Sequence, residues 1–146
     1  MKLNVGKAVL AGLAGTAVMT MLMLLAPKMG MPPMNIGAML GSVMGGYVAL
    51  GWVGHFMIGT VLALGYALVF AARIPGAPAV RGAIFSLLPW LMAQLVVMPV
   101  LGMGPFSGSM LVAGGSLMGH LVYGVVTGLV YGLPSEYAAA ARHAHA

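Results

Sequence analysis

Four long apolar stretches, separated by short segments richer in glycine, proline and basic residues, dominate the pattern of this chain. Each holds about 20 residues with almost no charge, which is the length that an α-helix needs to cross the hydrocarbon layer of a bilayer. Since lipid cannot satisfy a free backbone, helices are predicted and open strands are not. The predicted spans are residues 6–26, 47–72, 82–101 and 112–133.

The second and fourth stretches share a motif that indicates an internal repeat. GHFMIGTVLALGY occupies 54–66 and GHLVYGVVTGLVY occupies 119–131, so that Gly-His and a following Gly and Tyr recur at the same spacing. Upstream, PKMGMPP at 27–33 is similar to PVLGMGP at 99–105. Because each unit contains two spans, both units point the same way, and a two-fold axis along the membrane normal is expected. The predicted organisation is one membrane domain with repeat one at 6–72, repeat two at 82–133 and a C-terminal tail at 134–146.

The fold class is therefore predicted as an all-α, integral membrane four-helix bundle made of two parallel two-helix repeats. The connections at 27–46 and 102–115, which we call the first and second outer connections, are rich in methionine, glycine and proline and nearly free of charge. We expect them to form short interfacial or re-entrant segments. Asn35 and Ser107 are the predicted caps of short helices there.

Composition supports this picture, because 62% of the residues are hydrophobic and 5% are charged, against about a quarter charged in soluble domains. The net charge of +5 needs no nucleic acid to explain it, since basic residues concentrate in cytoplasmic loops. Of the six Lys and Arg residues, only Lys28 falls in the connections at 27–46 and 102–115. We expect a multi-pass protein of the bacterial inner membrane with a retained first helix and both termini cytoplasmic, because the other basic residues fall at the termini and in the central loop: Lys2, Lys7, Arg73, Arg81 and Arg142.

Several enzyme classes lack their residues in this sequence. Cysteine is absent, and Glu136 is the one acid. Paired carboxylates, an acid-supported catalytic triad and carboxylate metal sites are therefore excluded. We expect no enzymatic activity.

His55 and His120 hold equivalent places in the two repeats, each within an apolar span. Ionisable groups inside a span are rare and usually functional. Two facing imidazoles in a helical bundle can serve as the axial ligands of haem b. The neighbouring glycines would leave space around these ligands: Gly54, Gly59, Gly119 and Gly124.

The same pattern has a structural interpretation, which the sequence favours. Each imidazole can hydrogen-bond a neighbouring helix while the glycines permit close packing. A repeat copies a structural residue as faithfully as a functional one. Two further histidines, His143 and His145, lie in the tail and are interpreted as part of a basic terminus.

Methionine is the second candidate ligand, with fifteen in the chain. Met29, Met31 and Met34 form an M-x-M-x-x-M run in the first outer connection. Thioethers select Cu(I), so copper is a second cofactor to consider after haem b. The alternative is that these side chains only fill apolar gaps.

Small residues recur at four-residue spacing on the first and fourth spans, which predicts close helix contacts within this chain or with another subunit. Gln94 is expected to hydrogen-bond across the bundle. The predicted packing residues are Gly12, Gly15, Gly115, Gly128 and Gly132.

The paired Gly-His helices, the P-x-x-G-M connections and the small size resemble a group of uncharacterised bacterial four-span membrane proteins. The resemblance covers nearly the whole chain; it implies the fold and adds no catalytic residue. We expect a non-catalytic accessory subunit that packs, surrounded by lipid, against other membrane subunits or further copies in a respiratory or electron-transfer complex. The alternatives are a haem b carrier using His55 and His120, and a copper-binding or small-solute protein using the methionine-rich connections.

Overall fold

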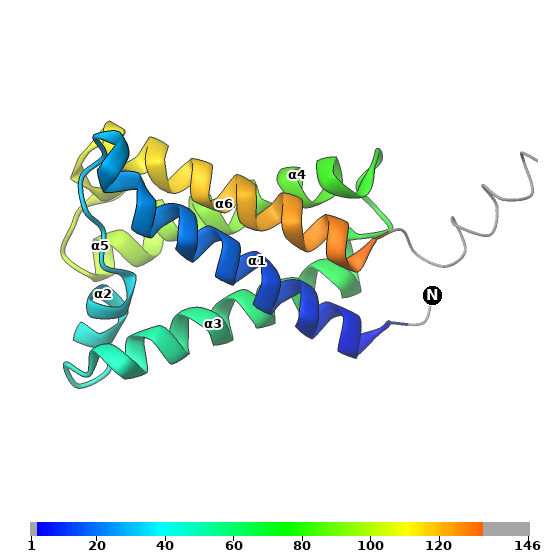
Figure 1. The fold of residues 1–146 in the computed structure, drawn as a ribbon, viewed down its shortest axis with the longest axis horizontal. Coiled ribbons are helices and arrows are strands. Elements are labelled where there is room, and N and C mark those ends of the chain that lie inside the picture. Colours follow the sequence, from blue (N-terminus) through cyan, green and yellow to red (C-terminus); the bar gives the residue numbers. More distant parts are fainter. Residues whose placement is uncertain (1–2, 133–146) are drawn as a thin grey trace, which may run out of the picture.

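Four long helices form the protein, and each is long enough to cross a membrane. In this computed structural model, which describes residues 3–132, they run over Val5–Met29, Val48–Phe70, Pro78–Val100 and Met110–Tyr131 (Figure 1). The shortest has 22 residues, which is about 33 Å at a rise of 1.5 Å per residue. No β-strand occurs within the described part. The prediction of an all-α membrane bundle is confirmed, and the chain is a multi-pass membrane protein.

Shorter elements extend or connect these helices. The tail at 134–146, with His143 and His145, lies outside the described residues, as does the predicted end of the fourth span. In chain order the elements are α1 (Val5–Leu25), a 3-10 turn (Ala26–Met29), α2 (Ile36–Ser42), α3 (Val48–Gly65), a π-helical turn (Tyr66–Phe70), α4 (Pro78–Met92), a second π-helical turn (Ala93–Val97), α5 (Met98–Val100), a 3-10 turn (Pro105–Gly108) and α6 (Met110–Tyr131).

Polar side chains cap the starts of α1, α2 and α6. The Asn4 side chain accepts the Lys7 N–H at the start of α1, and the Asn35 side chain accepts the Ala38 N–H at the start of α2. Such caps satisfy backbone donors that a helix leaves free at its first turn. The prediction for Asn35 is confirmed. The prediction for Ser107 is wrong, because Ser107 lies inside the 3-10 turn Pro105–Gly108, which Gly104 precedes, and its hydroxyl donates to the Gln94 side chain. The cap of α6 is Ser109.

The four helices pack in the order α3, α1, α6, α4, so that α1 and α6 form the centre of the bundle. Glycines set the close contacts between them. A Cβ on Gly12 would lie 2.7 Å from the Thr60 Cα of α3, and one on Gly15 would lie 2.9 Å from the Tyr123 carbonyl oxygen of α6. Side chains at these positions would push the helices apart.

The α4–α6 contact uses glycine on both sides. A Cβ on Gly124 would collide with the backbone of Gly82, and one on Gly128 would collide with the Pro78 carbonyl. Gly115 faces the Met31 side chain. Gly132, also predicted as a packing residue, instead ends α6 with a positive φ of 74°. The small-residue faces of α1 and α6 are thus used largely within the chain.

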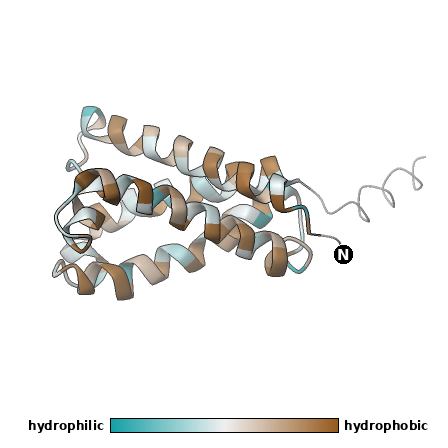
Figure 2. Cartoon of the chain, turned by 90° about the horizontal axis from the view of Figure 1, so that it is seen from below, coloured by the Kyte–Doolittle hydropathy of each residue, from teal (hydrophilic) through white to brown (hydrophobic). Residues whose placement is uncertain are grey.

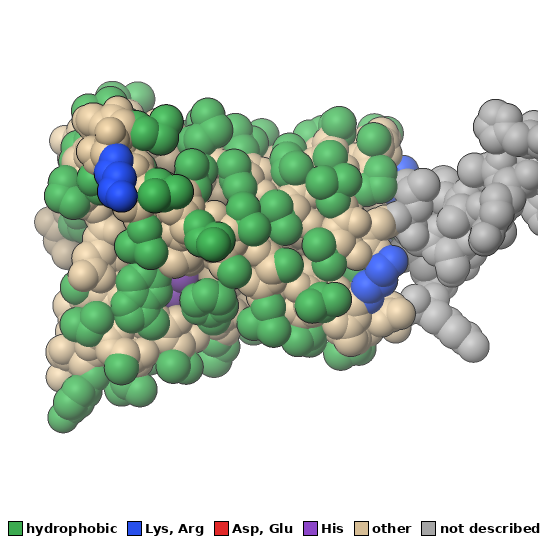
Figure 3. All heavy atoms as spheres, in the orientation of Figure 1, with side chains coloured by type: hydrophobic (Ala, Val, Ile, Leu, Met, Phe, Trp, Pro, Cys, Tyr) green, Lys and Arg blue, Asp and Glu red, His purple; other side chains and the backbone are tan. Residues whose placement is uncertain are grey.

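Outside these contacts all four long helices carry exposed apolar side chains, which gather over the face shown in Figure 3 and give the helices the hydrophobic colour of Figure 2. Leu10, Val53 and Leu129 are each about 60% exposed, at 59%, 64% and 59%. In Figure 3, basic side chains appear only near the two ends of this face. Such a surface suits contact with lipid tails along the whole length of the bundle.

The outer helices α3 and α4 come together at one end only. There the π-helical turn after α3 contacts α4, with the Tyr66 and Phe85 ring centroids 5.2 Å apart. Tyr131 of α6 joins this cluster, 6.0 Å from Tyr66. Towards the opposite end, which we call the α2 end, α3 and α4 diverge (Figure 1). This divergence leaves room for a cavity.

The first outer connection folds back onto the bundle at the α2 end. Its helix α2 packs against α3, and a Cβ on Gly41 would lie 2.7 Å from the Tyr47 carbonyl oxygen. The Trp52 indole lies against Gly37. The second connection contains two non-glycine residues in the left-handed region, Phe106 and Ser107, with φ of 54° and 57°. These two segments cover the α2 end of the space between the helices.

Candidate functional site

A large apolar cavity lies between the diverging helices at the α2 end. Its volume is about 470 Å³, within the range of small-molecule sites. All four long helices and α2 contribute to its wall, and His55, Ser116 and His120 are its polar lining residues. The described residues that line it include no Lys or Arg. Six methionines lie in the wall: Met19, Met23, Met34, Met39, Met92 and Met98.

The two histidines that the sequence singled out meet at this cavity. His55 comes from α3 and His120 from α6, and both also line a smaller adjoining cavity of about 60 Å³. A histidine side chain is visible in a hollow of the surface, in the region between α1 and α3 (Figure 3). The site is therefore shared by two helices that do not follow each other in the chain.

The hydrogen bonds of His55 determine which of its nitrogens is free. Its Nε2 lies 3.1 Å from the Thr20 hydroxyl of α1. That hydroxyl donates to the Thr16 carbonyl at 2.7 Å, and a carbonyl can only accept. Because the Thr20 hydroxyl hydrogen is used in that bond, the Thr20 oxygen acts as the acceptor towards His55. His55 Nε2 therefore carries a hydrogen and donates it to Thr20. In a neutral imidazole the other nitrogen, Nδ1, keeps its lone pair.

His120 has the opposite arrangement. Its Nδ1 lies 2.8 Å from the Ser116 carbonyl one turn earlier in α6. Because that oxygen can only accept, Nδ1 carries the hydrogen and Nε2 keeps the lone pair. Backbone carbonyls orient metal-binding and haem-binding histidines in the same way.

The two lone pairs have no partner within the protein. Neither His55 Nδ1 nor His120 Nε2 has a hydrogen-bond partner among residues 3–132. In residues 3–132, the Tyr66 hydroxyl is the one side-chain polar atom that is both fully enclosed and without a partner. The two histidine nitrogens have no partner either, so they are not fully enclosed by protein atoms. The site thus offers two imidazole lone pairs in apolar surroundings, and it can bind a metal, a metal cofactor or a hydrogen-bond donor.

A chain of polar side chains supports His120 from behind. Gln94 is fully buried; its amide donates to the Ser116 hydroxyl at 3.2 Å and accepts from the Ser107 hydroxyl at 2.8 Å. These hydrogen bonds therefore link the second outer connection to the turn of α6 that holds His120. Sequence reasoning predicted the cross-helix role of Gln94 and missed that of Ser107, because only the left-handed turn brings Ser107 to Gln94.

The glycines predicted to leave space around the histidines contact other parts of the chain. A Cβ on Gly54 would lie 3.3 Å from the Met44 sulfur, one on Gly59 would collide with the Thr16 hydroxyl, and one on Gly119 would lie 3.4 Å from the Met19 Cε. Gly124 packs on α4 as described. The space beside the histidines comes from the divergence of α3 and α4.

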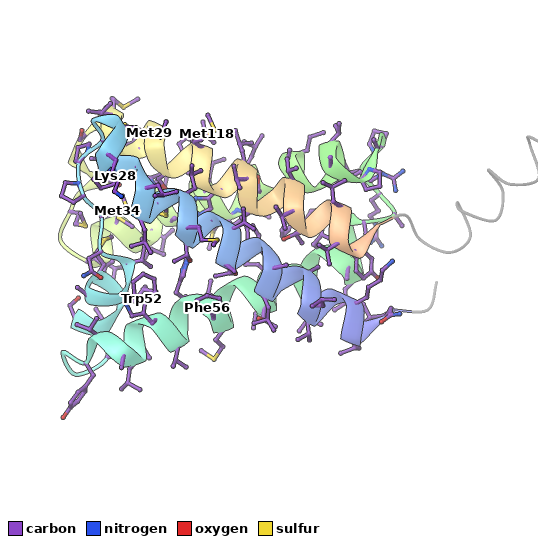
Figure 4. All side chains as sticks on the ribbon, viewed as in Figure 1. Lys28, Met29, Met34, Trp52, Phe56 and Met118 are labelled. Atoms are coloured by element: carbon purple, nitrogen blue, oxygen red, sulfur yellow. The ribbon has the colours of Figure 1, made fainter. Side chains whose placement is uncertain are left out.

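The three methionines predicted as copper ligands separate in the structure. Met29 is 76% exposed, and Figure 4 shows it at the α2 end of the bundle. Met31 and Met34 line a third cavity, of about 30 Å³. Only Met34 reaches the histidine cavity. Met19 and Met23 were not predicted as site residues, because they lie in the first span and are indistinguishable there from ordinary apolar residues.

Two aromatic side chains of α3 contact the His55 ring. The centroids of the Trp52 and Phe56 rings lie 6.0 Å and 5.9 Å from that of the His55 ring, both edge to face. Figure 4 shows Trp52 and Phe56 on α3. Such contacts restrict how the imidazole can turn.

The fold and the site together define a multi-pass membrane protein with a histidine-lined cavity between its helices. No curated protein sequence and no solved structure matches the chain. The chain belongs to the family of unknown function DUF6789, whose sequence model matches residues 3–141. The resemblance to an uncharacterised family is thereby confirmed, and the family assigns no activity.

Proposed function

We propose that this chain is a non-enzymatic membrane protein that holds a ligand or cofactor through His55 and His120. The observation that carries this proposal is that His55 and His120 line one apolar cavity while each keeps a ring nitrogen without a hydrogen-bond partner in the described part. Structural packing explains the protonated nitrogen of each ring, because that nitrogen bonds a neighbouring group. It does not explain why the other nitrogen of both rings is left without a partner at the same cavity.

The site is suited to holding a ligand and poorly suited to transforming one. Its polar lining residues are two histidines and a serine, and the whole chain has one acid and no cysteine. Acid–base and nucleophilic mechanisms usually need a third group to orient or activate the histidine, often a carboxylate.

The experiment is to purify the protein from its native membrane and identify what comes with it. Metal content by elemental analysis and organic ligands by native mass spectrometry would be compared with the double variant His55→Ala/His120→Ala. Met118→Ala is the matched control, because Met118 is 56% exposed on the same helix as His120. We expect a ligand in the wild type and the control that is absent from the double variant. Identical contents in all three proteins would refute the proposal.

Within this proposal the chain works as a subunit of a larger membrane assembly of the electron-transfer type. The chemistry of the site supports this role. A protein with so few reactive groups needs partner subunits that react with the ligand or cofactor it binds. Partners would contact the exposed apolar faces, because the glycine faces already pack inside the chain. Purification in a mild detergent tests this role, and recovery of this chain alone would count against it.

Haem b is the second candidate occupant, and the oriented bis-histidine pair favours it. The described lining residues offer its two carboxylates no basic partner, which counts against it. A reduced-minus-oxidised visible spectrum decides the question. A sharp α-band would establish haem, and a colourless protein would exclude it.

We also propose that the protein lies in a bacterial inner membrane with both termini in the cytoplasm. Lys28, at the α2 end (Figure 4), is the one basic residue in the two connections there, while the other basic residues flank the opposite ends of the spans. The histidine cavity would then lie in the outer half of the bilayer. Reporter fusions at the two termini test this orientation, which opposite locations would refute.

A further inference from the structure

We infer that the small cavity beside the histidines is a binding site for a soft monovalent metal ion, Cu(I) in chemical class, with Met19 as its third ligand. This inference rests on the proposed function and names the ligand of the same site. It places the metal within the bilayer, away from the exposed Met29 of the outer connection.

Three donor side chains share this small cavity. Its volume is about 60 Å³, and its lining includes His55, His120 and Met19. A water molecule needs only about 10–15 Å³ by the same kind of measure, so the space holds a metal ion and not an organic cofactor. Met19 is 6% exposed and lies against Gly119, the residue before His120.

The donors have the chemistry that a soft ion prefers. Both histidines line the site, and each keeps one ring nitrogen without a protein partner, because the other nitrogen is held by Thr20 or by the Ser116 carbonyl. A thioether is neutral and soft, and together with imidazole it favours Cu(I) over hard ions. No group of three or more His, Cys, Asp or Glu side chains comes together in residues 3–132, so the usual donor sets for zinc or magnesium are lacking there.

Charge also selects a monovalent ion. All three proposed ligands are neutral, and no Asp or Glu occurs in the described part. The cost of moving an ion from water into an apolar medium rises with the square of its charge, so a divalent ion would cost about four times as much. A monovalent ion therefore has the smaller free-energy cost of transfer into this site.

Further methionine thioethers line the neighbouring cavities towards the α2 end. The third cavity is lined by Met31, Met34 and Met23; the large cavity shares Met34 and Met23 and adds Met19. Met19 then lines the small cavity with the histidines. Successive cavities thus share a methionine, and an ion could pass from one thioether to the next without a charged ligand.

The test uses Ag(I), a soft monovalent ion that does not change oxidation state, and Cu(I) supplied anaerobically from a bicinchoninate complex. Purified protein in detergent should retain one ion per chain. Met19→Leu should weaken binding at least ten-fold, and His55→Ala/His120→Ala should abolish it. Met29→Leu is the matched control and should bind as the wild type does. Leucine replaces methionine with little change of volume, so Met19→Leu is expected to fold, which size-exclusion chromatography checks.

The outcomes separate this inference from the proposed function. X-ray absorption of the Cu(I)-loaded protein should show two nitrogen ligands and one sulfur, and a spectrum without sulfur would overturn the inference. Equal affinity of Met19→Leu and the wild type would do the same. If no metal binds while an organic ligand is lost from the double histidine variant, the inference fails and the proposed function stands.

Discussion

The contact between α4 and α6 gives the sharpest test of the packing, through the substitution Gly124→Ala. The added methyl would lie 2.6 Å from the Ser86 Cβ and closer still to the Gly82 backbone. Ordinary contacts begin at 3.4 Å, so the Ser86 contact alone requires the helices to separate by about 0.8 Å. The Gly82 backbone requires a larger separation, because it lies closer and cannot rotate away. Overpacking of this kind costs about 1–3 kcal/mol.

The control for this prediction lies on the same helix. A Cβ on Gly114 meets nothing within 4 Å, so Gly114→Ala should leave stability unchanged or raise it by up to about 1 kcal/mol through helix propensity. Unfolding both variants with increasing mole fractions of SDS in mixed micelles measures the difference. If Gly124→Ala unfolds together with Gly114→Ala, the close crossing of α4 and α6 is refuted.

Three further predictions concern the site and the α2 end. Gln94→Leu leaves two buried serine hydroxyls without their partner and should lower stability in the same micelle assay by about 1–3 kcal/mol; no loss would mean that the polar chain is incidental. Thr20→Val removes the acceptor that holds the His55 ring and should weaken ligand or Ag(I) binding about 10–100-fold with little change in stability; unchanged affinity in equilibrium dialysis would refute the assigned ring orientation. Asn35→Ala removes the cap of α2 and should destabilise that helix by about 1 kcal/mol, which hydrogen exchange of α2 would report; unaltered exchange there would contradict the cap.

Much of the fold follows from the sequence because the bilayer allows few alternatives. Length and hydropathy place the four helices, since a span must be helical and about 20 residues long. Asn35 was predictable as a cap because its short polar side chain precedes an apolar run. The start of α4 at Pro78, four residues before the predicted start, also has a local cause: proline suits the first turn of a helix.

The site was predictable only in part. The repeated Gly-His pairs pointed to His55 and His120, which do line one cavity. The cavity itself depends on where α3 and α4 separate, and helix periodicity carries no information about that. The π-helical turn before α5 illustrates the limit: Pro99 lacks an N–H and disturbs the hydrogen bonds of the preceding turn, but its effect on the path of the helix depends on packing.

The glycines show a further limit. Four-residue spacing predicts a close contact and does not name the neighbour. In the structure Gly12 and Gly15 face α3 and α6 of the same chain, so their presence does not argue for a partner subunit. Met19 is a site residue that the sequence does not indicate, since nothing in its sequence context distinguishes it from a lipid-facing residue.

The histidine ring nitrogens give the most direct measurement of the central claim, that two imidazoles turn free lone pairs into one cavity and bind one ligand. The ¹⁵N spectrum of histidine-labelled protein in lipid would be recorded for a His143→Gln/His145→Gln background, before and after adding Ag(I). We predict two neutral rings of opposite tautomer, with the hydrogen on Nε2 of His55 and on Nδ1 of His120, and a joint shift of the other two nitrogens when Ag(I) is added. Two rings of the same tautomer, or a shift confined to one ring, would contradict the account.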